Sequence, residues 1–138
     1  MISVGNVVLP NKPLSNYDII EAIKELKIPG FRGVFLRDQL PNRPRKKECG
    51  IINLADSDDS IGTHWVAYYK NIDLKIYFDS YGLPPPLELI YYLKDVTKSN
   101  IYQIQPNNTV ICGHLCLYVL KSLDKGNDFN DIILELLP

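Results

Sequence analysis

Two strand-like segments separated by three residues constrain the fold of this chain most strongly. HWVAYYK (64–70) and LKIYFDS (74–80) are rich in aromatic and β-branched residues, and the connection NID between them is typical of a hairpin turn. Antiparallel pairing brings the start of the first segment beside the end of the second. The pattern therefore predicts that His64 lies next to Asp79 or Ser80 at one open end of a sheet.

The remaining segments predict helices and further strands in one domain. Ser15 followed by Asp18 is typical of a helix start, and the apolar repeat that follows stops at Pro29-Gly30. Strands are expected over 31–36, 49–55 and 100–105, loops over 41–48 and 56–63, and helices over 87–96, 112–123 and a short last segment capped by Asn127. This order predicts an α+β fold for residues 1–138 rather than a doubly wound sheet.

Composition excludes several classes of protein. The 138 residues are 46% hydrophobic and 22% charged, and the net charge of −1 gives no global reason to expect nucleic-acid binding. The sequence has no run of 18 apolar residues to span a membrane, and residues 1–13 lack the features of a secretory signal. Three cysteines in such a chain predict reduced thiols in an intracellular protein. The basic cluster 43–47 lacks interleaved aromatic residues, so it is interpreted as a solvated loop rather than an anion-binding site.

Cys112 is the strongest candidate for a reactive group. It follows a polar loop and begins an apolar helical run, and a helix N-terminus lowers the pKa of a thiol because its dipole and free N–H groups stabilise the thiolate. Gly113 beside it leaves room for a substrate backbone. Taken alone, a Cys-Gly pair more often marks a buried structural cysteine, so other residues must decide. Cys116, one helical turn later, and Cys49, at a strand start, are interpreted as core residues.

His64 is the candidate general base, because the rival histidine is badly placed. His114 lies two residues after Cys112 on the same predicted helix, which turns its side chain about 200° away from that thiol. Asp79 can accept a hydrogen bond from the His64 imidazole, fix its tautomer and stabilise the imidazolium. Taken separately, His64 fits a surface histidine and Asp79 fits a turn former equally well.

Gln105 is the candidate donor to an oxyanion. It lies seven residues before Cys112, and its side-chain amide can donate to the oxyanion together with the Cys112 backbone N–H. Gln103 shares its face of the predicted strand but sits further back, so it is the weaker alternative. The four parts of a thiol protease (nucleophile, base, orienting acid and oxyanion donor) are thus assigned to Cys112, His64, Asp79 and Gln105.

The order of three segments, GTHWVAYY, IYFDSYG and IQPNNTVICGHLC, resembles the adenovirus maturation proteases, which are adenain-like enzymes in the clan of the ubiquitin-like-protein proteases. Those enzymes carry a His-Trp pair at a strand start, an acid before an aromatic-Gly turn, and a Gln ahead of a Cys-Gly at the spacing found here. The matching positions are His64-Trp65, Asp79 with Tyr81-Gly82, Gln105, and Cys112-Gly113. INLADS and FRGVFLRDQLP also fit. The whole chain is most similar to the short adenain-like enzymes of Polinton transposons, virophages and related elements.

This resemblance implies a papain-like fold in which a mixed, mainly antiparallel sheet packs against helices. It implies a cysteine endopeptidase that processes capsid or other virion precursor proteins during maturation, with Trp65 and Gly113 supporting the catalytic residues. A preference for small, Gly-rich cleavage sites would agree with Gly33, Gly50 and Gly113 leaving room near the cleft. The expected enzyme is a monomer without cofactor or metal, located in the host cytoplasm or nucleus or packaged in the virion. A peptide or DNA activator is not implied, because the cysteine that attaches the adenovirus peptide cofactor has no counterpart that can be placed here.

Three other functions compete with this one. The same catalytic residues would serve a deubiquitinase or deSUMOylase-type isopeptidase. A catalytically degenerate protease would instead be a binding domain. A zinc site built from Cys112, His114 and Cys116 is disfavoured, because His114 faces away from the two thiols and no second ligand pair exists.

Overall fold

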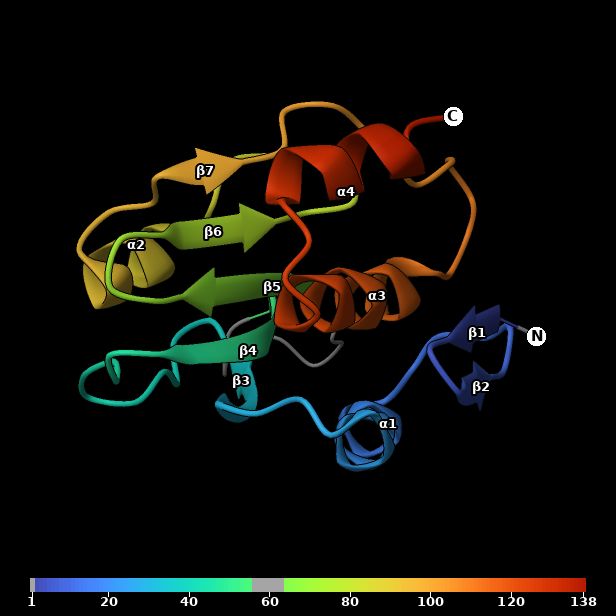
Figure 1. Ribbon diagram of the computed structural model, residues 1–138, viewed down its shortest axis with the longest axis horizontal. Coiled ribbons are helices and arrows are strands. Elements are labelled where there is room, and N and C mark those ends of the chain that lie inside the picture. The colour runs from blue at the N-terminus through green and yellow to red at the C-terminus, as the bar shows by residue number, and fades with distance from the viewer. Residues whose placement is uncertain (1, 56–63) are drawn as a thin grey trace.

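The computed structural model describes residues 2–55 and 64–138, which form two sheets and four helices. In chain order the elements are β1 (Ile2–Val4), β2 (Val7–Leu9), α1 (Asn16–Leu26), β3 (Phe31–Leu36), β4 (Glu48–Asn53), β5 (Trp65–Lys70), β6 (Lys75–Phe78), α2 (Leu87–Leu93), β7 (Lys98–Ser99), α3 (Cys112–Asp124) and α4 (Phe129–Leu136) (Figure 1). The predicted loop 56–63 lies outside the described residues. Within the described ranges, no helix has the length and apolar character needed to cross a membrane.

The main sheet has five strands in the order β3-β4-β5-β6-β7. Its three middle strands are antiparallel, and the outer strands β3 and β7 run parallel to their neighbours β4 and β6. The segments predicted as strands over 31–36, 49–55, 64–70 and 74–80 supply four of the five strands. The prediction of an α+β fold with a mixed sheet is therefore confirmed.

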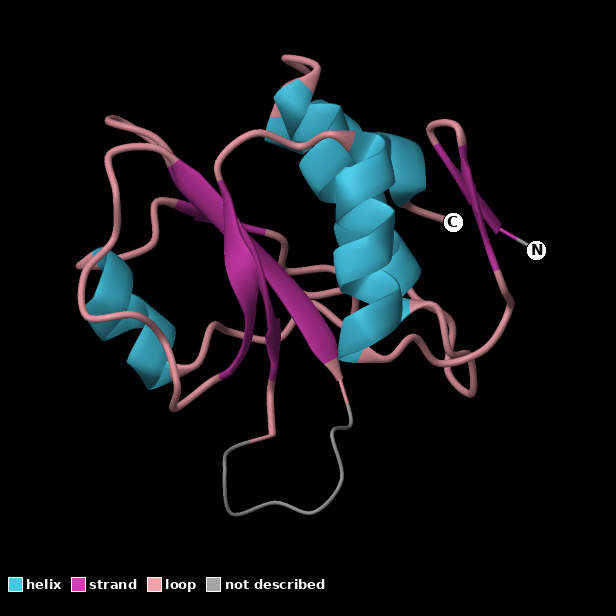
Figure 2. Cartoon of the chain, turned by 90° about the horizontal axis from the view of Figure 1, so that it is seen from below, coloured by secondary structure: helices cyan, strands magenta, loops and turns pink. Residues whose placement is uncertain are grey.

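Helices cover both faces of this sheet, because successive residues of each strand point to opposite sides. Ile51 and Phe78 belong to the larger core with α1, α3 and α4, whereas Ile52 and Tyr77 belong to a smaller core with α2. Figure 2 shows the single short helix on one side of the sheet and the larger group of helices on the other. Burial on two faces explains why β4 and the first four residues of β5 are buried without alternation.

Local hydrogen bonds set the two ends of α1. The Ser15 hydroxyl accepts from the Asp18 N–H, and the Asp18 carboxylate accepts from the Ser15 N–H, so the predicted helix start is a capping box. The helix ends at Leu26, before the predicted Pro-Gly stop, because Lys27 adopts a left-handed φ of 54°. The capping box at the start of the helix also places the residue before it, Leu14, which lines the cleft described below.

Residues 100–105 do not form the predicted strand, and β7 is limited to Lys98–Ser99. The Asn100 side chain takes the place of a strand partner. It accepts from the Asp79 N–H at 3.1 Å and donates to the Asp79 carbonyl at 2.6 Å. Side-chain amides compete with sheet ladders in this way. The strand predicted over 100–105 is therefore wrong. The alternating pattern of NIYQIQ carries no information about the side-chain hydrogen bonds of Asn100, which replace the strand pairing.

Two further differences concern the ends of the chain. Residues 2–9 form the β1–β2 hairpin, which the sequence patterns do not predict, around Gly5 at a left-handed φ of 57°. The last helix is capped by Asp128 rather than by Asn127. The Asp128 carboxylate accepts from the N–H groups of Asn130 and Asp131, two and three residues further on, which is the reach of an N-cap side chain. Asn127 lies one residue too early to make both contacts.

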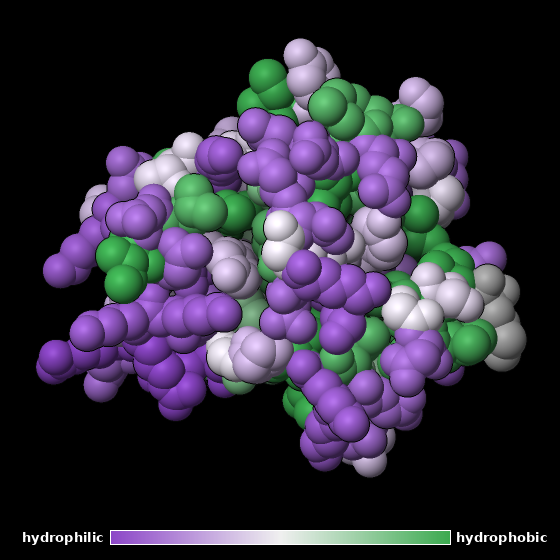
Figure 3. Space-filling model, viewed as in Figure 1, coloured by the Kyte–Doolittle hydropathy of each residue, from purple (hydrophilic) through white to green (hydrophobic). Residues whose placement is uncertain are grey.

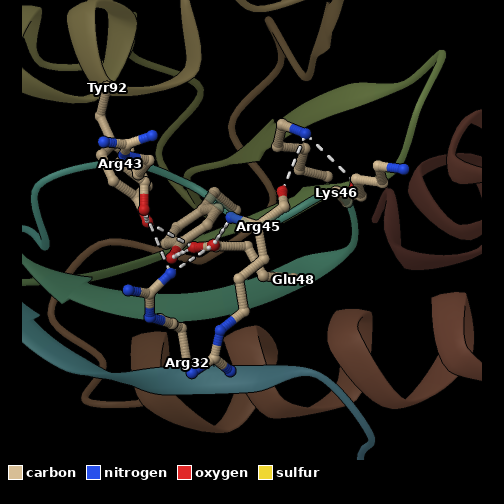
Figure 4. A network of polar contacts seen from close by, with 8 residues as sticks. Arg32, Arg43, Arg45, Lys46, Glu48 and Tyr92 are labelled. Atoms are coloured by element: carbon tan, nitrogen blue, oxygen red, sulfur yellow. Dashed lines mark hydrogen bonds and ion pairs between the residues drawn. The ribbon is translucent and has the colours of Figure 1, made fainter.

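A buried carboxylate holds the basic segment 43–47 against the sheet (Figure 4). Glu48 is 1% exposed and accepts hydrogen bonds from four donors: Tyr68 (2.5 Å), Tyr92 (2.8 Å), Arg32 (3.0 Å) and the Arg45 N–H (2.6 Å). Burial by itself would raise the pKa of Glu48, but the hydrogen bonds, led by that from Tyr68, lower it. The charged carboxylate therefore joins β3, β4, β5 and α2 at this end of the sheet.

The backbone of the basic segment points inward, while its side chains point outward. The Lys70 ammonium donates to the carbonyls of Arg45 and Lys46, and Arg32 donates to the carbonyl of Arg43. The four cationic side chains of the segment are exposed, namely Arg43, Arg45, Lys46 and Lys47. Figure 3 shows hydrophilic side chains gathered on the left of the view, where the β3–β4 connection lies in Figure 1. The predicted solvated loop is confirmed, although its backbone is held in place.

Candidate active site

The four predicted residues meet at one end of the sheet. His64 directly precedes β5, Asp79 directly follows β6, and Cys112 is the first residue of α3. Gln105 comes from the loop between β7 and α3. A cleft of about 590 Å³ is lined by His64, Gln105 and Cys112, and Asp79 is fully buried behind His64. The segment ahead of α1, the strand β3 and the loop before α3 form the other walls of the cleft.

His64 is held by Asp79 and by the ring of Tyr81. The imidazole Nε2 lies 2.7 Å from Asp79 Oδ1, which also accepts from the Tyr81 N–H at 2.9 Å. The Tyr81 ring stacks on the imidazole with the two centroids 4.8 Å apart. The observed register pairs Ala67 with Phe78, so its continuation puts Tyr81 opposite His64. Asp79, two residues before Tyr81, therefore reaches the imidazole as a diagonal cross-strand neighbour rather than from the directly opposite position.

Cys112 and His64 form a polarised pair. Because Asp79 occupies Nε2, the other ring nitrogen, Nδ1, is available to the thiol. Burial opposes ionisation of Cys112, but hydrogen bonds with His64 and with the backbone N–H groups of Trp65 and Gly113, together with the charge of His64, lower the pKa of the thiol. Hydrogen bonds from the start of β5 thus add to the effect of the helix start, to which the Gly113 N–H belongs.

The contacts of His64 raise the pKa of its imidazole to about 9. Burial disfavours the imidazolium, but hydrogen bonds to Asp79 and Cys112 and the negative charges of both groups outweigh that effect. A cysteine with a lowered pKa beside a histidine with a raised pKa favours the thiolate–imidazolium form of the pair. The pair can therefore supply both a nucleophile and a proton donor near neutral pH.

Gln105 is fixed at both ends of its side-chain amide. Its Oε1 accepts from Ser80 Oγ at 2.7 Å, and its Nε2 donates to the Thr109 carbonyl at 2.9 Å. Gln105 is 1% exposed, yet it lines the cleft. Gln103, the weaker alternative, is exposed and donates to the Gln105 carbonyl and to Asn107. Gln103 therefore braces the loop, and Gln105 is the amide that borders the cleft.

Trp65 and Gly113 support the site by packing as well as through their backbone N–H groups. The Trp65 indole N–H donates to the Leu14 carbonyl at 2.8 Å and so fixes the segment ahead of α1. A Cβ at Gly113 would lie 3.2 Å from side-chain atoms of both Leu14 and Trp65. The missing side chain at Gly113 thus lets three segments pack together next to Cys112, rather than leaving room for a substrate backbone as predicted.

Gly33 and Gly50 do not make room for a substrate. A Cβ at Gly50 would lie 2.5 Å from the ring of Tyr68, and a Cβ at Gly33 would lie 2.9 Å from the ring of Phe35. Both glycines accommodate aromatic rings of the protein itself. These two residues therefore give no support to a preference for Gly-rich cleavage sites.

His114 and the other two cysteines belong to the core. His114 is 1% exposed, and its Nε2 lies 2.7 Å from the Pro10 carbonyl oxygen, which ties α3 to the N-terminal segment. Cys49 and Cys116 are free and buried, as predicted. In the part of the chain that the structure describes, no cluster of three or more potential ligands could hold a metal ion. The zinc site considered above is therefore not formed by these residues.

The sequence patterns indicate no role for Ser80 or Asn100. Asn100 binds both backbone groups of Asp79, and Ser80 binds the Gln105 amide. The signal for Ser80 is its place directly after the acid at a strand end. No comparable signal marks Asn100, because its partner lies 21 residues earlier in the chain.

The three cysteines are expected to react with iodoacetamide at very different rates. Burial raises the pKa of Cys49 to about 12 and raises that of Cys116 well above its ordinary value, whereas the pKa of Cys112 is lowered. Because the thiolate is the reactive form, Cys112 should be alkylated at least ~100-fold faster at neutral pH. Time-resolved peptide mapping by mass spectrometry measures the three rates, with urea-unfolded protein as the control. Equal labelling of the three thiols in the folded protein would contradict the prediction.

Solved structures that are similar to this chain in fold include two of one protease. The crystal structure of the ASFV pS273R protease matches with a TM-score of 0.61 at 17% identity and covers 90% of this chain and 62% of that chain. The selenomethionine form of the same protease matches with a TM-score of 0.62 at 15% identity over the same shares. At these identities the likeness shows the fold alone, and it confirms the predicted papain-like fold of the adenain type. No family model and no curated protein matches the sequence.

Proposed function

We propose that this protein is a cysteine endopeptidase with Cys112 as its nucleophile. The observation that carries the proposal is the chain of contacts from a thiol at a helix start to His64 and on to buried Asp79, with His64 Nε2 2.7 Å from Asp79 Oδ1. A cysteine that only packs in the core would not need a histidine and a buried carboxylate in this series of contacts. The likeness in fold to a protein described as a protease supports the same function.

In the proposed acylation step, the Cys112 thiolate attacks the carbonyl carbon of a peptide and forms a C–S bond. The charge that develops on the carbonyl oxygen is bound by the Gln105 side-chain N–H and by the Cys112 backbone N–H. The His64 imidazolium gives its proton to the leaving amine as the C–N bond breaks, and a thioester remains. Asp79 keeps the imidazole oriented during this transfer.

Water completes the proposed cycle. Neutral His64 takes a proton from a water molecule that attacks the thioester carbonyl. The C–S bond then breaks, the carboxylic acid product leaves, and the thiolate–imidazolium pair of Cys112 and His64 is restored. His64 carries every proton in the cycle. Its Nε2 must therefore stay hydrogen-bonded to Asp79 throughout, so that Nδ1 remains free to exchange protons with the reacting groups.

We further propose that the substrate is a capsid or other virion precursor protein. The resemblance of three motif segments to adenain-like enzymes supports this substrate, as does the match to the ASFV pS273R protease. The test is incubation with the structural proteins encoded alongside this chain, followed by mass spectrometry of the fragment N-termini. Defined fragments that are absent with a Cys112→Ala control support the proposal.

Other outcomes of the same experiment separate the alternatives. Intact precursors together with cleavage of a ubiquitin-like fusion would favour the isopeptidase. Intact precursors together with cleavage of an unrelated peptide would keep the endopeptidase and reject the capsid substrate. No turnover of any peptide by the folded protein would leave a binding domain.

The pH dependence of kcat/KM is expected to be bell-shaped. Activity rises on the acid side as Cys112 loses its proton, at a pH below the ordinary thiol pKa of 9.0. Activity falls on the alkaline side near pH 9, where the His64 imidazolium loses the proton that the leaving amine needs. Asp79→Asn should move the alkaline limb to lower pH, because the Asp79 hydrogen bond and charge raise the pKa of His64. An alkaline limb that is the same in both proteins would remove Asp79 from this role.

A further inference from the structure

The adjacent residues Asp79 and Ser80 serve two different parts of the site. They directly follow β6, where successive side chains point to opposite sides of a strand. Asp79 Oδ1 contacts the His64 imidazole, whereas Ser80 Oγ donates to Gln105 Oε1 at 2.7 Å. Asp79 and Ser80 are each 0% exposed, so water does not compete for either contact.

Ser80 and Thr109 together fix the orientation of the Gln105 side-chain amide. The Thr109 carbonyl can only accept, so it requires the amide nitrogen, and the Ser80 hydroxyl donates to the amide oxygen. Among the described residues, Thr109 is the single acceptor for Gln105 Nε2, which leaves the second N–H for a ligand in the cleft. A reversed amide would set Oε1 against the Thr109 carbonyl and would repel an oxyanion.

The backbone of Ser80 constrains the same loop a second time. Its carbonyl accepts from the N–H groups of Ile104 at 2.8 Å and Gln105 at 3.0 Å. Ser80 therefore holds Gln105 by its main chain and by the far end of its side chain. A donor that is fixed before the reaction stabilises a developing charge without reorganising.

We propose that Ser80 is a positioning residue that orients the Gln105 amide toward the oxyanion formed when Cys112 attacks the substrate. The dipeptide Asp79-Ser80 then sets both the general base and the oxyanion donor. This inference rests on the proposed function, because it needs peptide cleavage through Cys112.

The test compares Ser80→Ala with the wild-type protein in peptide cleavage. Loss of an oxyanion donor lowers kcat by about 10²- to 10³-fold. In Ser80→Ala the Gln105 amide is held by Thr109 alone, so kcat should fall by about 10- to 100-fold with KM near its original value. Alkylation of Cys112 by iodoacetamide needs the thiolate but no oxyanion site, so its rate should not change. A merely structural disturbance would change both rates. Ser122→Ala, which removes another buried hydroxyl in α3 and outside the cleft, should leave both unchanged.

Two further variants make the outcome decisive. In a Gln105→Ala background, Ser80→Ala should cost nothing more, because Ser80 acts through Gln105. If Ser80→Ala lowers the melting temperature below that of the assay, Ser80→Cys replaces it, since a thiol fills the space of the hydroxyl but donates weakly. An unchanged kcat in the folded Ser80 variant, or an additive loss in the double variant, overturns the role of Ser80 alone. A wild-type protein that cleaves no peptide overturns the proposed function and this inference together.

Discussion

Replacing Cys112 by alanine should lower kcat for peptide cleavage by about 10⁶-fold, which is the loss seen when the nucleophile of a catalytic triad is removed. Without Sγ no thioester can form, so His64 and Gln105 have no covalent intermediate on which to act. The Cys112 side chain is partly exposed at the first turn of α3, so its truncation should leave the fold intact. Steady-state kinetics measures the loss, and circular dichroism with a melting curve checks the fold.

Cys49→Ala is the matched control for this variant. Cys49 lies buried in β4, away from the cleft, so its truncation should lower the melting temperature and leave kcat unchanged. Loss of activity in both variants would indicate a folding defect rather than a missing nucleophile. Full activity in Cys112→Ala would end the assignment of the nucleophile.

Replacing Glu48 by alanine should lower the free energy of unfolding by about 3–5 kcal/mol, the range for removing one partner of a buried ion pair. The Arg32 guanidinium would lose its buried carboxylate, and the Tyr68 and Tyr92 hydroxyls would lose their acceptor. Glu48→Gln should lose less, because it keeps the volume and one acceptor oxygen. Urea unfolding measures the change, and an unchanged slope with denaturant shows that the same transition is followed.

Glu88→Ala provides the comparison at the surface. Glu88 lies 3.6 Å from Arg37, and the side chains of this pair are 40% and 36% exposed. An exposed pair of this kind contributes about 0–1 kcal/mol. Similar losses in the two variants would show that the buried carboxylate is not the anchor of this end of the sheet.

The hairpin and α1 could be predicted because their signals are local. The connection NID joins two strand-like segments, and Ser15 and Asp18, three positions apart, form the capping box of α1. The failure at 100–105 has the opposite cause. Asn100 binds the backbone of Asp79 instead of extending a strand, and nothing near it in sequence announces that contact.

The site divides in the same way. Cys112 and His64 could be proposed because a thiol at a helix start and a histidine at a strand start are visible in sequence. The contact of His64 with Asp79, however, depends on the register between β5 and β6. The hairpin connection does not fix that register uniquely. The role of Ser80 is not predictable in this way, because its partner, Gln105, lies in a loop whose alternating sequence pattern predicts a strand.

The shape of the basic segment 43–47 is specified from outside the segment. Glu48, Arg32 and Lys70 bind its backbone N–H and carbonyl groups, whereas its own cationic side chains make none of these contacts. The path of the backbone and the charge of the side chains are therefore determined by different residues at this surface. We therefore expect that replacing these cationic side chains by neutral or acidic ones changes the surface charge without changing the path of the chain. The segment is thus a place where surface properties can diverge between related chains at no cost to the fold that carries the cleft.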